Sequence, residues 1–193
     1  IELDPDFASA YGRAAHCYAI ARANGWISVT PNEIAEVTRL AQRAVELGKD
    51  DAIVIASSGW ALAHFVLDLE AAAGLIDRAL MLNSNLAEAW FWGGWVKIWR
   101  GEPEAAIERF ARALRLNPID PRVSGMRSGI AHAHFFLGRH DKAASWAAMA
   151  LQDHPDHQPG LRIEAASNAM AGQSEQAHKA VARLRHLNPT LRV

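Results

Sequence analysis

Residues 86–118 read LAEAWFWGGWVKIWRGEPEAAIERFARALRLNP, and this stretch contains every part of a repeating unit. It begins with an apolar run rich in tryptophan, breaks at Gly101, continues with an amphipathic run and ends at Asn117-Pro118. Because glycine and proline terminate helices, the stretch predicts two helices joined by a short turn. Small residues that would let these helices approach closely are Gly93, Gly94, Ala106 and Ala113.

The same terminators recur along the chain. Gly101, Gly138 and Gly172 are separated by 37 and 34 residues. Proline pairs follow in step, at Asp4-Pro5, Asn117-Pro118, His154-Pro155 and Asn188-Pro189. A period of this length indicates an array of helical repeats. We therefore expect about five antiparallel helix pairs, at 6–48, 51–83, 86–116, 121–153 and 158–187.

Three departures from the period are informative. The first pair has about ten extra residues between its helices, around 24–29, and then Thr30, Pro31 and Glu33 form a capping box at a helix start. The turn at 67–69 has no glycine. About three extra residues lie near 120–123. These changes alter local spacing and leave the architecture intact.

The third unit resembles the tetratricopeptide repeat (TPR) pattern, which it matches at Trp90, Gly93, Gly94, Ala106, Phe110, Ala113 and Pro118. The resemblance implies an all-α fold: a right-handed α-solenoid of about five TPR-like helix pairs, forming one superhelical domain over residues 1–193. It also implies that the chain binds another polypeptide. We expect a protein-interaction scaffold and no enzyme.

Two phrases, 1–11 and 105–121, together with the long first unit that ends near Trp26, resemble the C-terminal TPR region of certain bacterial signalling proteins. Those proteins carry an N-terminal class III nucleotide cyclase or winged-helix domain. The resemblance implies a cytoplasmic regulatory fragment of a longer multidomain protein. Both ends of the sequence, at Asp4-Pro5 and 188–193, look like interrupted repeats. We therefore expect the last helix to present an open apolar stripe, which an absent segment or a partner covers, at Ala177, Ala180, Val181 and Leu184.

Composition excludes several other classes of protein. Lys and Arg number 20 against 21 for Asp and Glu, so no net field attracts nucleic acid. No run approaches the roughly 18 apolar residues of a membrane span. Cys17 is the single cysteine, which excludes an internal disulfide and a cysteine-based zinc site, and we expect it to be a small core residue.

Nine histidines raise the question of a metal site. His132 and His134 are two residues apart and point about 200° apart on a helix, so they cannot share an ion. His154 and His157 flank a proline in a loop, where solvated side chains are the expected state. No nucleophile motif or phosphate loop is present. We expect no catalytic residue, metal or cofactor.

In TPR arrays the first helices of successive pairs line the concave side, and the resemblance therefore suggests the groove residues. The residues that we expect to line the binding groove are His16, Trp60, His64, Phe91, Trp95, Trp99, His132, Phe136 and Arg162. Chaperone-tail binders of the family clamp a terminal carboxylate with Lys, Arg and Asn, whereas Arg162 is the one clear cation here. The pattern favours an apolar helix or extended segment as ligand.

Burial in the core is the alternative for the tryptophans. It is the default expectation for Trp90 and Trp146, and it stays open for Trp95 and Trp99. We expect Trp60, His64 and Phe91 to be exposed, so that removing Trp60 or Phe91 would abolish binding with little loss of stability.

Two other functions remain open. The module could regulate its own chain or form a homodimer through its groove or ends. It could also be an α-solenoid that binds a small ligand or metal, or catalyses a reaction, through His16, His64 and His132.

Overall fold

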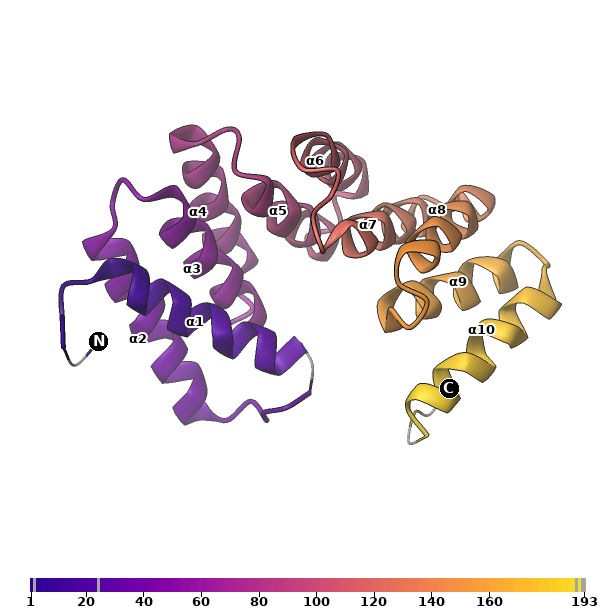
Figure 1. Cartoon of the computed structure of the whole chain (residues 1–193), viewed down its shortest axis with the longest axis horizontal. Coiled ribbons are helices and arrows are strands. Elements are labelled where there is room, and N and C mark those ends of the chain that lie inside the picture. The colour runs from indigo at the N-terminus through magenta and orange to yellow at the C-terminus, as the bar shows by residue number, and fades with distance from the viewer. Residues whose placement is uncertain (2, 24, 190, 192–193) are drawn as a thin grey trace. The chain divides into compact units, whose positions relative to one another are not determined.

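The computed structural model describes residues 1, 3–23, 25–189 and 191. This part of the chain contains ten α-helices and no strand, which confirms the all-α class and the five helix pairs. Each of the five predicted pairs begins and ends within two residues of its expected position. The helices (Figure 1) are α1 (Ala8–Ala23), α2 (Pro31–Leu47), α3 (Ala52–Phe65), α4 (Leu69–Leu82), α5 (Ala87–Trp99), α6 (Pro103–Leu116), α7 (Val123–Phe136), α8 (His140–Asp153), α9 (Gln158–Met170) and α10 (Ser174–Leu187).

The helices form two compact units, unit 1 (Ile1–Arg100) and unit 2 (Gly101–Val193). Within each unit every helix packs against the next one along the chain. In addition, α3 packs against α1 and α5, and α7 packs against α9, so the first helices of neighbouring pairs lie side by side. The predicted third pair contributes α5 to unit 1 and α6 to unit 2. One continuous domain over 1–193 stays a prediction.

Small residues sit at the helix contacts, as the sequence predicts. Ala72, Ala79, Ala106 and Ala113 are all fully buried. In unit 2, α6 and α7 approach closely, and a Cβ atom at Gly129 would collide with the buried ring of Phe110. The motif aromatic of α6 therefore packs directly on the backbone of α7.

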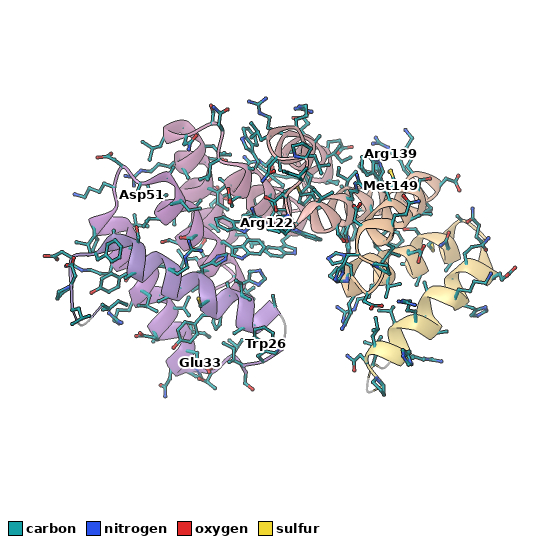
Figure 2. All side chains as sticks on the ribbon, in the orientation of Figure 1. Trp26, Glu33, Asp51, Arg122, Arg139 and Met149 are labelled. Carbon is teal, nitrogen blue, oxygen red and sulfur yellow. The ribbon has the colours of Figure 1, made fainter. Side chains whose placement is uncertain are left out.

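Local hydrogen bonds fix the helix starts. The N–H of Thr30 donates to the Glu33 carboxylate at 2.8 Å and the N–H of Glu33 donates to the Thr30 hydroxyl at 3.4 Å, which confirms the predicted capping box. Asp51 caps α3 by accepting from the N–H groups of Ile53 and Val54. Figure 2 labels Glu33 and Asp51 at these two positions.

The loop before the capping box places Trp26, labelled in Figure 2, largely in solvent, with 72% of its surface exposed. Asn24 in the same predicted insertion lies outside the described residues, as do Glu2, Thr190, Arg192 and Val193 of the terminal phrases. None of the described helices is both long enough and apolar enough to cross a membrane.

The predicted extra residues between α6 and α7 form a loop organised by Asp120. This buried carboxylate accepts hydrogen bonds from the Arg122 guanidinium at 2.6 and 2.7 Å and from the Asn117 amide at 3.1 Å. The hydrogen bond from Arg122 holds the pKa of Asp120 below its usual value. The loop is thus a fixed part of unit 2.

One sequence expectation is wrong, and a second holds only in part. Cys17 is exposed, because α1 buries the face that carries Tyr11, Gly12, Ala15 and Ala19. On α10, Ala177, Ala180 and Leu184 are largely buried against α9, and Val181 is partly open. Three residues of this stripe, Ala177, Val181 and Leu184, nevertheless line an apolar groove of about 690 Å³ along α9 and α10.

The α3–α4 turn contains a left-handed residue although it has no glycine. Leu67 adopts a positive φ of 58°, whereas Gly101, Gly138 and Gly172 take this conformation after α5, α7 and α9. A non-glycine residue in the left-handed region is strained by about 1–2 kcal/mol. Leu67 is also 66% exposed, so its side chain recovers little of that energy through packing.

Replacement of this leucine, Leu67→Gly, is expected to raise the free energy of unfolding by about 0.5–1 kcal/mol, because relief of strain exceeds the added flexibility of the unfolded chain. Urea unfolding followed by circular dichroism measures the change. The reverse substitution, Gly101→Leu, serves as control and should destabilise the protein. An unchanged or lower midpoint for Leu67→Gly would contradict the strain.

Candidate functional site

Six predicted groove residues come together in unit 1. His16 lies on α1, Trp60 and His64 on α3, and the remaining three on α5. Trp92 of α5 joins them, although the sequence did not single it out as a site residue. We call these seven residues the aromatic surface: His16, Trp60, His64, Phe91, Trp92, Trp95 and Trp99.

Trp60 is the centre of the aromatic surface. Its ring stacks on Trp92, with centroids 6.1 Å apart and planes 19° apart, and on Trp99, with centroids 5.5 Å apart and planes 22° apart. Phe91 lies 6.5 Å from the same ring, and Trp95 lies 6.3 Å from Trp99. Such stacked and tilted pairs are favourable contacts that hold each ring in one orientation.

His64 fills the corner between two of these indoles. Its ring meets Trp60 edge-to-face at 4.3 Å and Trp99 edge-to-face at 5.1 Å. Burial, together with the nearby positive charges of Arg22 and His16, lowers the pKa of His64 to about 4. Its Nε2 atom is buried and has no hydrogen-bond partner among the described residues. His64 is therefore a neutral part of the surface at pH 7.

The aromatic rings differ in depth. Trp92 is buried, with 4% of its surface exposed. Trp99 is the most exposed tryptophan of the aromatic surface, at 39%. Trp60 and Phe91 are partly buried and pack against the hydrophobic core of unit 1. The expectation that Trp60, His64 and Phe91 are exposed is therefore wrong, and Trp60 and Phe91 cannot be removed without loss of stability. Trp95 is half-buried, and Trp99 is exposed.

Two tryptophans outside the aromatic surface, Trp90 and Trp146, support the structure. Trp90 is partly buried against the core, and its indole N–H donates to the carbonyl of Ser84 at 2.9 Å. Trp146 packs against a small apolar cluster of unit 2. Four other residues of the first helices are buried between helices, namely Gly12, Ala56, Ile98 and Ser128.

The other three predicted groove residues lie in unit 2. His132 on α7 is half-buried and donates from Nδ1 to the Ser128 carbonyl at 2.7 Å. Phe136, at the end of α7, is 62% exposed. Arg162 on α9 is exposed and lies beside the α9–α10 groove, where it donates to Gln158 at 3.4 Å.

Among the described residues, no group of three or more His, Cys, Asp or Glu side chains is placed to hold a metal ion. His154 and His157 have ring centroids 6.0 Å apart. His157 accepts a hydrogen bond from the Gly160 N–H through Nδ1, and burial lowers its pKa to about 4. His157 thus acts as the cap of α9.

Solved structures match this chain over almost its whole length, whereas no protein-family model and no curated protein matches it. MamA of AMB-1 is 18% identical with a TM-score of 0.68, and the match covers 94% of this chain and 99% of that one. YrrB, described as a TPR protein with an unusual peptide-binding site, is 19% identical with a TM-score of 0.62 over 98% of this chain and 91% of that one. The chain has the TPR fold. The TPR fold confirms the helical-repeat architecture that the period of the sequence predicted.

Two tryptophans of the aromatic surface are expected to contribute differently to the free energy of unfolding, because they differ in exposure and packing. Trp60→Ala should lower the free energy of unfolding by about 2–4 kcal/mol, because it removes the ring on which Trp92 and Trp99 stack. Trp99→Ala should lower it by less than Trp60→Ala does, since 39% of the Trp99 side chain is already exposed to water. Urea unfolding of both variants tests the difference, and equal losses would contradict the assigned depths.

The low pKa of His64 predicts a pH dependence of stability. Above about pH 6.5 this histidine is neutral in both the folded and unfolded states. As the pH falls from about 6.5 to 4, only the unfolded state gains the proton. The free energy of unfolding therefore falls by up to about 3 kcal/mol. Unfolding measured between pH 7.5 and 4 on the wild type and on His64→Gln isolates this contribution from that of His157. Parallel profiles for the two proteins would contradict it.

Proposed function

We propose that this chain is a non-catalytic protein-interaction scaffold and that its aromatic surface holds a peptide or helix of a partner protein. The observation that carries the proposal is the stack of Trp60 and Trp99 above a buried Trp92. Aromatic rings already fixed by their neighbours lose little conformational entropy on binding, and such residues dominate binding hot spots.

The electrostatics of the surface support an apolar anchor at its centre. The indoles carry no charge, and His64 is neutral at pH 7. Arg22 lies with its guanidinium 5.5 Å from the ring centroid of Phe65, close to His64. The centre of the surface therefore suits an apolar side chain, and a cation lies close beside it.

The same proposal includes the predicted residues of unit 2. His132, Phe136 and Arg162 lie on α7 and α9, which are first helices of their pairs. We assign them to contacts that unit 2 makes with a partner. Support comes from the exposure of Phe136 and Arg162.

The proposed biological setting is the regulatory part of a cytoplasmic bacterial signalling protein. Support for this setting comes from the resemblance of the phrases 1–11 and 105–121 to TPR regions that follow a nucleotide cyclase or winged-helix domain. A TPR protein with a peptide-binding site, YrrB, provides a precedent for peptide binding on this fold.

Selection of peptides from a displayed random library on the whole chain tests the proposal. We expect enriched peptides with an apolar anchor, whose binding is measured by isothermal titration calorimetry. Trp99→Ala should weaken Kd at least tenfold, about 1.4 kcal/mol, because it removes the exposed ring of the stack.

The matched control is Met81→Ala, which removes an apolar side chain of α4 that is 81% exposed and lies outside the aromatic surface. Its Kd should equal that of the wild type. Peptides that bind Trp99→Ala as tightly as the wild type, or a library that yields none, would count against the proposal. Concentration-dependent mass in light scattering, abolished by Trp99→Ala, would favour a homodimer instead.

A further inference from the structure

The apolar groove along α9 and α10 lies at a helix that has a single neighbour. In the described part of the chain, α10 packs against α9 and against no other helix. Elsewhere both helices of a pair contact the first helix of the next pair: α3 packs against α1 and α2, α5 against α3 and α4, and α9 against α7 and α8. The groove between two paired helices is thus the place where this fold receives a third helix.

Small apolar side chains form the floor of the α9–α10 groove, whose volume is about 690 Å³. On α9, Ala165 and Ala166 are partly open to solvent and Ala169 is exposed. On α10, Val181 is partly open. Short side chains let the backbone of a packing helix approach closely, and longer aliphatic side chains of that helix then fill the remaining space. The floor therefore suits a helix with an aliphatic stripe.

Positive charge is concentrated at one end of this groove. α9 and α10 are joined by the short turn 171–173 and run antiparallel (Figure 1). Arg162 near the start of α9 and Arg185 near the end of α10 therefore lie at the same end, and both line the groove. His178 lines it toward the other end. The described lining residues include no Asp or Glu, so the lining does not neutralise this charge.

The acidic residues close to this pair in the sequence have other partners. Asp156 accepts from the Arg183 guanidinium at 2.6 Å. Glu175 pairs with Lys179 at 2.6 Å. Arg185 is exposed and forms no hydrogen bond or ion pair with any other described residue. The positive end of the groove thus attracts acidic side chains of another molecule.

The same charge disfavours a symmetric dimer through this groove. Two copies that met face to face would use the same residues on both sides of the contact. Both sides would then contribute Arg162, His178 and Arg185, and neither would contribute an acidic lining residue. Like charges across an interface weaken association. The complementary occupant is therefore a different polypeptide.

We infer that the α9–α10 groove binds an amphipathic helix of a partner protein, whose aliphatic stripe packs on the alanine floor and whose acidic residues lie beside Arg162 and Arg185. Its aliphatic residues recur at every third or fourth position. The inference goes beyond the proposed function, which places a partner on the aromatic surface of unit 1, and it gives Arg162 a specific contact in unit 2.

A displayed library of helical peptides tests the inference. Each peptide has about 18 residues, long enough to form a helix, with Leu fixed at every third or fourth position. The flanking positions are randomised among Glu, Gln and Lys. Selection on the whole chain should enrich Glu at one end of the leucine stripe. Enrichment of Gln or Lys there, or of no residue, would overturn the inference.

Charge reversal places the selected helix in the groove. Arg185→Glu should weaken the Kd of the Glu-bearing peptide about tenfold, because attraction becomes repulsion, and should tighten binding of the same peptide with Lys in place of Glu. The matched control is Arg115→Glu, which reverses an exposed arginine near the end of α6, outside the groove. Its Kd should equal that of the wild type, and equal losses in the two variants would overturn the inference.

A blocking substitution tests the alanine floor. Ala169→Gln adds a long side chain at an exposed position, so the fold should be retained in circular dichroism while the peptide binds at least about tenfold more weakly. On the wild type, bound peptide should slow hydrogen exchange of the α10 amides and leave α6 unchanged. Unchanged exchange in α10 at saturating peptide would overturn the inference.

The outcomes separate this inference from the proposed function. Helical peptides that need Trp99 and bind Arg185→Glu and Ala169→Gln normally would overturn the groove and leave the scaffold function intact. Peptides that need Arg185, with none that needs Trp99, would support the groove and contradict the role of the aromatic surface. Self-association in light scattering that Ala169→Gln abolishes would identify a second copy as the occupant and overturn the inference.

Discussion

Close approach of neighbouring helices is the constraint on which the rest of this structure depends. Isolated helices of 13–17 residues are marginal in water, so each helix here is stable only when a neighbour covers one of its faces. Alanine and glycine at the contacts make that possible, as the collision between a Cβ at Gly129 and Phe110 shows. The same constraint brings α1, α3 and α5 together, and the aromatic surface exists because large rings project from those helices.

The fold was predictable because its signals are local. Breakers repeated every 34 or 37 residues, and the capping residues Thr30 and Glu33 act within one turn of helix. Leu67 was the exception. Its side chain gives no sign of a left-handed turn, and the conformation is imposed by the helices on both sides.

The candidate site was predictable only in part. The structure places the predicted rings of α1, α3 and α5 in contact with one another, but the repeat phase could not state their depth. Trp60 is half-buried because two indoles stack on it, and that depends on contacts between helices far apart in sequence.

The stacking of Trp60 with Trp92 and Trp99 also has an optical consequence. Indole rings whose centroids are 5.5 and 6.1 Å apart are close enough for their electronic transitions to couple, so light absorbed by one ring is shared among the three. The protein therefore carries a built-in exciton-coupled chromophore. Its ultraviolet dichroism should contain a contribution from the tryptophans superimposed on the helical signal, and that contribution reports directly on the geometry of α3 against α5.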